Sequence, residues 1–206
     1  MSETIGFVFG SIPKQPTDAP VSDLTFSNSN ILRITYLGVN NNGSPVISYN
    51  LEIDDGNGGE FVSLYGDLVN TMTLTYTFSN NVQKGDTYRA RYRALNQVGW
   101  SGFSPIGYLI AASVPDAPQA PKFVSATTTT ISILVPRVLE NNGSPVTHYV
   151  LFIDDGLGGN FSPINSYDQN PAFLIDASVE TTLVSGRIYR IKSQASNVIG
   201  TGAFSD

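Results

Sequence analysis

Apolar and polar residues alternate with a period of two along much of the chain. The clearest runs cover residues 32–36, 49–53, 72–78 and 88–95. Such spacing puts one face of an extended segment on a core and the other in water, as in a β-strand. Turn signals rich in Asn, Gly, Ser and Pro separate the runs. The pattern therefore predicts an all-β chain of short antiparallel strands packed as a sandwich.

The chain also repeats itself at an interval of about one hundred residues, which indicates two copies of one module. The matched segments are Asn41–Val46 with Asn141–Val146, Tyr49–Gly56 with Tyr149–Gly156, and Tyr88–Asn96 with Tyr189–Asn197. Gly99 and Phe103 are answered by Gly200 and Phe204. Two copies account for nearly the whole chain of 206 residues.

The repeated motifs resemble those of the fibronectin type III module. The family's strand F pattern of Tyr, Ala, Asn and Gly fits Tyr88, Ala94, Asn96 and Gly99, and again Tyr189, Ala195, Asn197 and Gly200. An Asn-Gly-Ser-Pro run leads to the third strand at Asn42 and at Asn142. Tyr36 and Val135 stand near the place of the family's tryptophan, so the resemblance implies a sandwich whose core is packed differently there.

The resemblance implies an imbalance between the two ends of the chain. In the first copy, residues 106–110 match strand G, the last strand of the module. The second copy stops at Phe204–Asp206, where its strand G is expected to begin, while residues 4–13 resemble a spare strand G. We therefore expect an N-terminal strand over 1–13, a first module over 14–113, and a second module over 114–206 that lacks its own strand G.

A sandwich without its last strand leaves an open sheet edge, which invites pairing with another chain. We expect an N-terminal donor strand to fill the vacancy in a neighbouring copy. The donor residues are Ile5, Phe7, Val8 and Phe9, and the acceptor edge is formed by Tyr189, Ile191, Ser193 and Ala195. Head-to-tail contacts of this kind build an open filament unless they close a ring. The alternative is a fragment of a longer tandem array.

Composition argues against several classes of function. The net charge of −6 is unsuited to nucleic acid, whose phosphates attract a basic surface. No apolar run reaches the roughly 18 residues of a membrane helix, so no membrane insertion is expected. The chain has no cysteine and a single histidine, His148, which argues against catalytic triads and Cys- or His-based metal sites. We expect no enzyme activity, no cofactor and no metal.

Two repeated motifs still suggest other chemistry. Asp54-Asp55 and Asp154-Asp155 precede glycines and resemble calcium ligands, but neither copy has the alternating ligands of an EF-hand loop. A glycine-rich hairpin explains them more simply. Asn42 and Asn142 begin Asn-Gly-Ser sequons and are candidate glycosylation sites. The proline after each sequon is expected to hinder modification.

The sequence thus favours a non-enzymatic structural protein of the extracellular space or cell surface. Its partners would be further copies of itself, joined head to tail, or flanking fibronectin type III modules. The alternative function is a spacer or adhesion pair cut from a larger cell-surface or carbohydrate-active multidomain protein.

Overall fold

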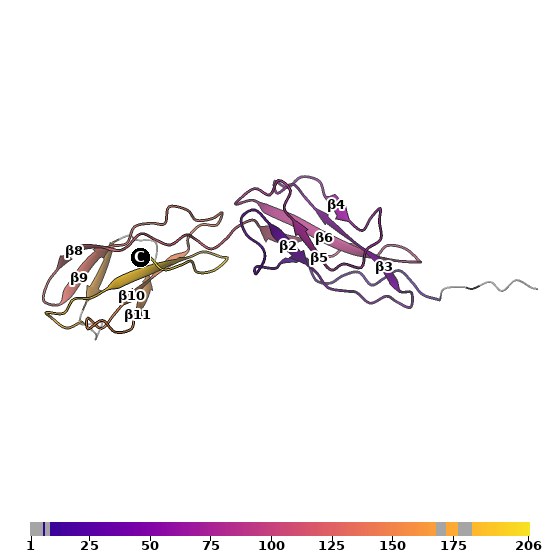
Figure 1. Cartoon of the computed structure of the whole chain (residues 1–206). Coiled ribbons are helices and arrows are strands. Elements are labelled where there is room, and N and C mark those ends of the chain that lie inside the picture. Colours follow the sequence, from indigo (N-terminus) through magenta and orange to yellow (C-terminus); the bar gives the residue numbers. More distant parts are fainter. Residues whose placement is uncertain (1–5, 7–8, 168–171, 177–182) are drawn as a thin grey trace, which may run out of the picture. The chain divides into compact units, whose positions relative to one another are not determined.

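A computed structural model describes residues 6, 9–167, 172–176 and 183–206. The chain divides into two compact units, Met1–Ala112 and Ser113–Asp206, which we call module 1 and module 2. In each module the described strands are antiparallel and form two sheets, as Figure 1 shows. The predicted all-β sandwich architecture is confirmed.

Module 1 places three strands in one sheet, in the order β1-β2-β5, and four in the other, in the order β4-β3-β6-β7. The strands are β1 (Val21–Ser22), β2 (Leu32–Thr35), β3 (Val46–Ile53), β4 (Val62–Tyr65), β5 (Thr75–Phe78), β6 (Thr87–Asn96) and β7 (Gly107–Ile110). The longest ladder joins β3 to β6, where Tyr49 pairs with Ala94 and Ile53 with Ala90. The predicted strand G is present as β7, which pairs with β6.

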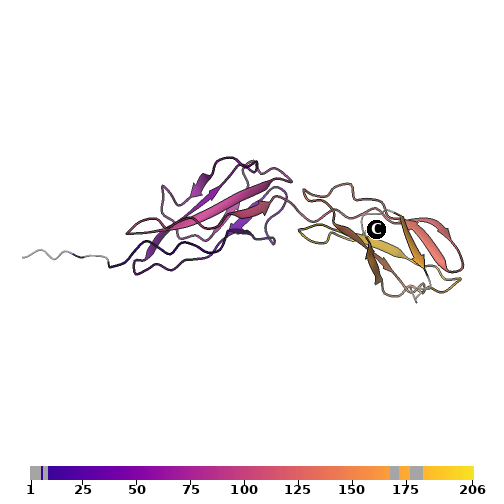
Figure 2. The same ribbon diagram turned by 180° about the vertical axis from the view of Figure 1, so that it is seen from behind.

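Module 2 repeats this two-sheet arrangement, which Figure 2 shows from behind. Among its described residues each sheet has three strands, in the orders β12-β9-β8 and β11-β10-β13. The strands are β8 (Lys122–Ala126), β9 (Thr130–Leu134), β10 (His148–Ile153), β11 (Ser162–Tyr167), β12 (Ala172–Asp176) and β13 (Ile191–Ser196). β13 takes the place of β6 and pairs with β10 from Ile191 opposite Ile153 to Ser196 opposite His148. It is therefore an edge strand in the described part of module 2.

The alternating residues predicted to face inward form the core of each module. In module 1, Leu32, Ile34 and Leu51 are fully buried, and each contributes about 1.5–3 kcal/mol of hydrophobic stabilisation. Tyr36, which stands near the place of the tryptophan in fibronectin type III modules, packs on Tyr92 with ring centroids 4.3 Å apart. Module 2 has the smaller Val135 and Ser193 at these places, so its core is packed by less side-chain volume there.

Candidate strand-acceptor site

The site begins with what β7 does in module 1. Residues Gly107 to Ile110 pair with β6 from Ala90 to Thr87, and Leu109 and Ala111 are buried in the core. The Ala111 N–H donates to the Asp86 carbonyl at 2.9 Å, and the Ala111 carbonyl accepts from the Gly85 N–H at 2.8 Å. The last strand thus pairs with the main-chain groups at the start of β6 and covers one side of the core.

Module 2 has an apolar groove at the corresponding place, between β8 and the chain leading into β13. Its volume is about 390 Å³, and it is lined by Pro121, Phe123, Ala126, Ile131, Ile133, Arg187, Ile188, Tyr189 and Ile191. Two large apolar side chains of its lining, Phe123 and Ile188, are 69% and 86% exposed. The groove is open where β7 closes module 1.

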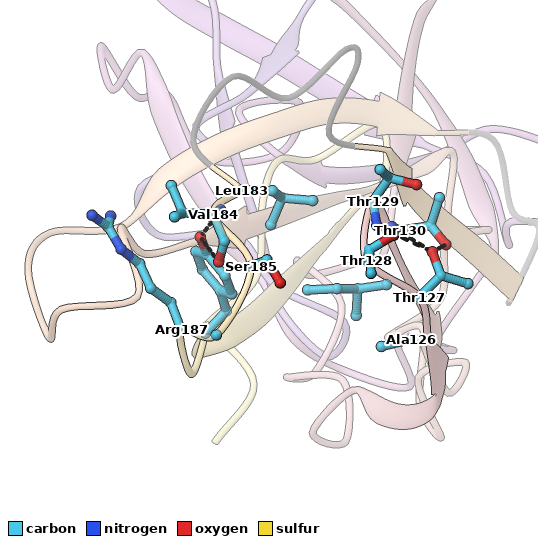
Figure 3. A pocket seen from close by; sticks show the side chains of 12 residues that line it. Ala126, Thr127, Thr128, Thr129, Thr130, Leu183, Val184, Ser185 and Arg187 are labelled. Atoms are coloured by element: carbon cyan, nitrogen blue, oxygen red, sulfur yellow. Dashed lines mark hydrogen bonds between the residues drawn. The ribbon is translucent and has the colours of Figure 1, made fainter.

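A second cavity of about 180 Å³ shares several walls with this groove. Figure 3 shows the β8–β9 turn, with Thr127 to Thr130, on one side and Leu183 to Ser185 on the other. Gly186 and Arg187 also line it, and they are the counterparts of Gly85 and Asp86 in module 1. Together the two cavities run along the region that a last strand would cover.

Two of the four residues of the predicted acceptor edge already have main-chain hydrogen-bond partners. The Ser193 carbonyl accepts from the Ser205 N–H, and the Ala195 carbonyl accepts from the Gly202 N–H. Both side chains are fully buried. Ser193 and Ala195 are therefore already covered by the segment that follows β13, and an incoming strand would pair further upstream. Tyr189 and Ile191 line the groove, together with Ile188, which sequence reasoning missed.

The predicted donor strand lies mostly beyond what the structure describes, since Ile5, Phe7 and Val8 are outside the described residues. Phe9 is described and is fully exposed, whereas its counterpart Ala111 is fully buried.

The residues after the donor segment are fixed to module 1 by two asparagines. Asn96 Nδ2 donates to the Ser11 carbonyl at 2.7 Å, and Asn42 Nδ2 donates to the Ile12 carbonyl at 2.9 Å. In module 2, Asn197 and Asn142 bind Ser113 and Val114 in the same way, at 2.8 and 2.9 Å. The side-chain amides of both candidate glycosylation sites thus anchor the segment that leads into a module. Glycosylation at either site stays a prediction.

Asn42 and Asn142 also adopt the left-handed backbone conformation, with φ of 51° and 55°. Asparagine tolerates this conformation better than most residues, because its short side-chain amide can form hydrogen bonds with nearby backbone groups. The repeated Asn-Gly motif was visible in the sequence, but its bonds to residues about thirty positions upstream were not. Asn96 and Asn197 were found only as family positions, and the anchoring role of these two residues was missed.

The paired carboxylates are occupied by hairpin and strand contacts. Asp54 Oδ2 accepts from Arg89 Nε at 2.7 Å, and Asp154 binds Arg190 Nε at the same distance. Asp55 Oδ1 accepts from the N–H groups of Asn57 and Gly59, and these bonds lower the pKa of its carboxyl. In the described residues no cluster of three or more His, Cys, Asp or Glu side chains could hold a metal ion. These carboxylates shape the hairpin between the third and fourth strands.

The outward face of β6 is a ladder of arginines and aromatic rings. Arg89, Arg91 and Arg93 form salt bridges with Asp54, Glu52 and Asp67, respectively. Arg91 lies 3.9 Å from the centroid of Phe103, and Arg93 lies 4.5 Å from that of Trp100. The arginines of this face therefore pair locally, within module 1. Trp100 packs on its own module.

His148 begins β10 and lies 3.1 Å from the Thr147 hydroxyl through Nδ1. It is half-buried. None of the described segments forms a helix of the length and apolarity that crossing a bilayer requires.

Comparisons with known proteins found similar sequences and similar folds. Over 165 residues the chain is 27% identical to fibronectin type III domain containing protein 3C1 of Mus musculus, covering 79% of this chain and 12% of that protein. The FN1–FN3 domains of chicken CNTN1 superpose with a TM-score of 0.55 at 16% identity, over 96% of this chain and 67% of that one.

Domains A168–A170 of titin give a TM-score of 0.58 at 16% identity, over 91% of this chain and 59% of that one. No protein-family model matches the sequence. The chain spans about an eighth of the mouse relative it matches. The motifs, the sheet order and these likenesses support two tandem β-sandwich modules that resemble fibronectin type III modules.

Proposed function

We propose that the chain is a non-enzymatic structural subunit of an extracellular filament or surface array. Subunits assemble head to tail, because the N-terminal strand of one copy, with Ile5, Phe7, Val8 and Phe9, completes module 2 of its neighbour. The partner is a second copy of the same chain. The role is mechanical linkage rather than chemistry.

The groove beside β13 carries this proposal. Module 1 needs β7 to cover the same region, where Leu109 is 1% exposed and Ala111 is fully buried. In module 2 the equivalent region leaves Phe123 and Ile188 exposed. Covering large apolar side chains returns about 1.5–3 kcal/mol for each one fully buried, and strand pairing adds main-chain hydrogen bonds. A β-strand with alternating apolar residues is the ligand that fits this edge.

Deletion of residues 1–9 tests the proposal. The deletion stops at Phe9 because Ser11 is bound by Asn96 and Asn42, so a longer one would also disturb module 1. We expect polymers from the full chain and monomers from the truncated chain, seen by size-exclusion chromatography and negative-stain microscopy. A full-length variant with Phe7→Ser and Phe9→Ser serves as a matched control of unchanged length. Monomers from all three proteins, or polymers from all three, would contradict the proposal.

The mouse relative favours a second candidate function. Because the match covers 12% of that protein, two such modules can be a small part of a long chain. Here the pair would be a spacer or adhesion segment of a larger cell-surface or carbohydrate-active protein, and flanking sequence would complete module 2. Under this alternative the full-length and truncated chains behave alike as monomers.

A further inference from the structure

We infer that the donor strand enters module 2 in one fixed register, antiparallel to β13, with Phe7 opposite Tyr189 and Val8 opposite Ile188. This inference rests on the proposed function and specifies its contact residue by residue. The register is inferred from the equivalent contacts that each module makes with the segment leading into it.

The leading segments of the two modules match bond for bond. The Ser11 N–H donates to the Asn42 carbonyl at 3.1 Å, and the Ser113 N–H donates to the Asn142 carbonyl at 2.9 Å. A Cβ on Gly99 would lie 3.3 Å from Ile12, and one on Gly200 would lie 3.3 Å from Val114. Together with the asparagine bonds above, these contacts make Ser11 the structural counterpart of Ser113.

Counting back from these anchors aligns the two strands. Ala111 lies two residues before Ser113, and Phe9 lies two residues before Ser11. The buried positions of module 1's last strand, Gly107, Leu109 and Ala111, therefore correspond to Ile5, Phe7 and Phe9. Both sets of residues are spaced two apart. In the inferred register, the three large apolar residues of the donor would therefore face the core, as their counterparts in module 1 do.

The acceptor side aligns through its tyrosines. The Tyr88 hydroxyl accepts from the Gln83 N–H, and the Tyr189 hydroxyl accepts from the Val184 N–H. Tyr88 pairs with Leu109, so Tyr189 is expected to pair with Phe7. By the same correspondence, Phe9 would receive a hydrogen bond from the Gly186 N–H and donate one to the Arg187 carbonyl.

The groove suits larger inward side chains than β7 provides. Phe9 would replace an alanine at the cavity near Gly186, and Ile5 would replace a glycine beside Pro121 and Ile191. The two cavities, of about 180 and 390 Å³, offer room for this extra volume. Module 1 does not, because a Cβ on Gly107 would lie 2.0 Å from the Pro20 carbonyl oxygen. Ile5 could not take that place in module 1.

Cysteine cross-linking tests the register, since the natural chain contains no cysteine. A Val8→Cys chain and a size-tagged Ile188→Cys chain are mixed and oxidised mildly. Directly opposed residues of antiparallel strands have Cα atoms about 4.5–5.5 Å apart, which is within the range of a disulfide. The matched control replaces the first chain by Gly6→Cys, which the inferred register puts on the diagonal at about 7–8 Å. Residue 188 is exposed, and position 6 corresponds to the exposed Tyr108, so both changes avoid the core.

We expect a disulfide heterodimer from the Val8→Cys mixture and its loss in the Gly6→Cys mixture. Equal heterodimer in both mixtures would overturn the register while leaving strand donation intact. Heterodimer from Gly6→Cys alone would assign a register shifted by two residues. No heterodimer from either mixture, while the variants still form polymers, would overturn both the register and the proposed function.

Discussion

Asn197 holds the start of module 2 to its last described strand. Its Nδ2 group faces the carbonyls of Ser113, Asn141 and Ser144, and its Oδ1 accepts from the N–H groups of Ile199 and Gly200. Asn197→Asp keeps the shape and the acceptor but turns the donor into an oxygen that faces carbonyl oxygens. We expect module 2 to lose about 1–3 kcal/mol, the cost of an unsatisfied buried group.

The single tryptophan separates the two modules in this measurement. Trp100 lies in module 1, so its fluorescence follows that module, while circular dichroism follows both. Asn197→Asp should shift only the dichroism transition, and the matched Asn96→Asp should shift the fluorescence transition. If both variants unfold like the natural chain, the asparagines do not anchor the leading segments.

Asp154 makes the stability of module 2 sensitive to acid. Burial raises the pKa of its carboxyl, but the hydrogen bonds from Arg190 and Gly156 outweigh burial and hold the pKa below its usual 3.8. The unfolded state therefore binds a proton first as the pH falls. The stabilisation is present above pH 3.8 and disappears as the pH drops through the lower value of the folded protein.

We expect the melting temperature of module 2 to fall below about pH 4, where unfolded carboxyl groups take up protons. Asp154→Asn should lower the melting temperature of module 2 at neutral pH. In acid, the difference in melting temperature between this variant and the natural chain should become smaller. Melting curves of both proteins across this pH range measure the difference. A gap that stays constant would show that the ionised carboxylate of Asp154 contributes nothing.

At the scale of single strands, β7 fits module 1 through one close contact. The Pro20 carbonyl lies where the Cβ of any residue other than glycine at position 107 would stand, at 2.0 Å. Gly107→Ala should therefore destabilise module 1 by about 1–3 kcal/mol or more, because backbone must shift to relieve the overlap. Tyr108→Ala is the control, since Tyr108 is 70% exposed. Trp100 fluorescence in denaturant would report both, and equal midpoints would contradict the contact.

How far the sequence predicts such elements depends on what decides them. Alternation found the strands around Ile34, Leu51 and Tyr92, because burial of one sheet face dictates a period of two. It extended the strand before Phe78 too far, since the structure begins β5 at Thr75. Upstream, Leu74 still bonds the Tyr36 N–H through its carbonyl, but Thr71 bonds Tyr49 on the other sheet. A segment that crosses between sheets leaves no mark in a local pattern.

At the scale of the whole molecule, the repeat predicted two modules because identical motifs fold alike. It could not predict the groove, because the residues that line it come from β8, β9 and the chain leading into β13, which are far apart in the sequence. It also gave no sign that the carbonyls of Ser193 and Ala195, in the predicted acceptor edge, already accept hydrogen bonds. The bonds from Gly202 and Ser205 to β13 come from a loop whose path is not visible in residue spacing.

The groove should also accept the donor strand as a free peptide. A peptide of residues 3–10 that binds only folded module 2 should stabilise it by about 2.7 kcal/mol at a concentration one hundred times its dissociation constant. In the chain lacking residues 1–9, this would raise the dichroism transition and leave that of Trp100 in place. In the full chain, the peptide should shorten or abolish polymers, because it occupies the groove that extends them.

The same peptide with Phe7→Ser and Phe9→Ser is the control, because it keeps the backbone and loses most of the apolar area. It should neither stabilise module 2 nor shorten polymers. An effect of both peptides alike would point to main-chain pairing without the groove. A shift of the Trp100 transition would show that the strand enters module 1 as well, against the contact between Gly107 and Pro20. Selective stabilisation of module 2 by the natural peptide alone is the result that would support binding of this segment in the groove beside β13.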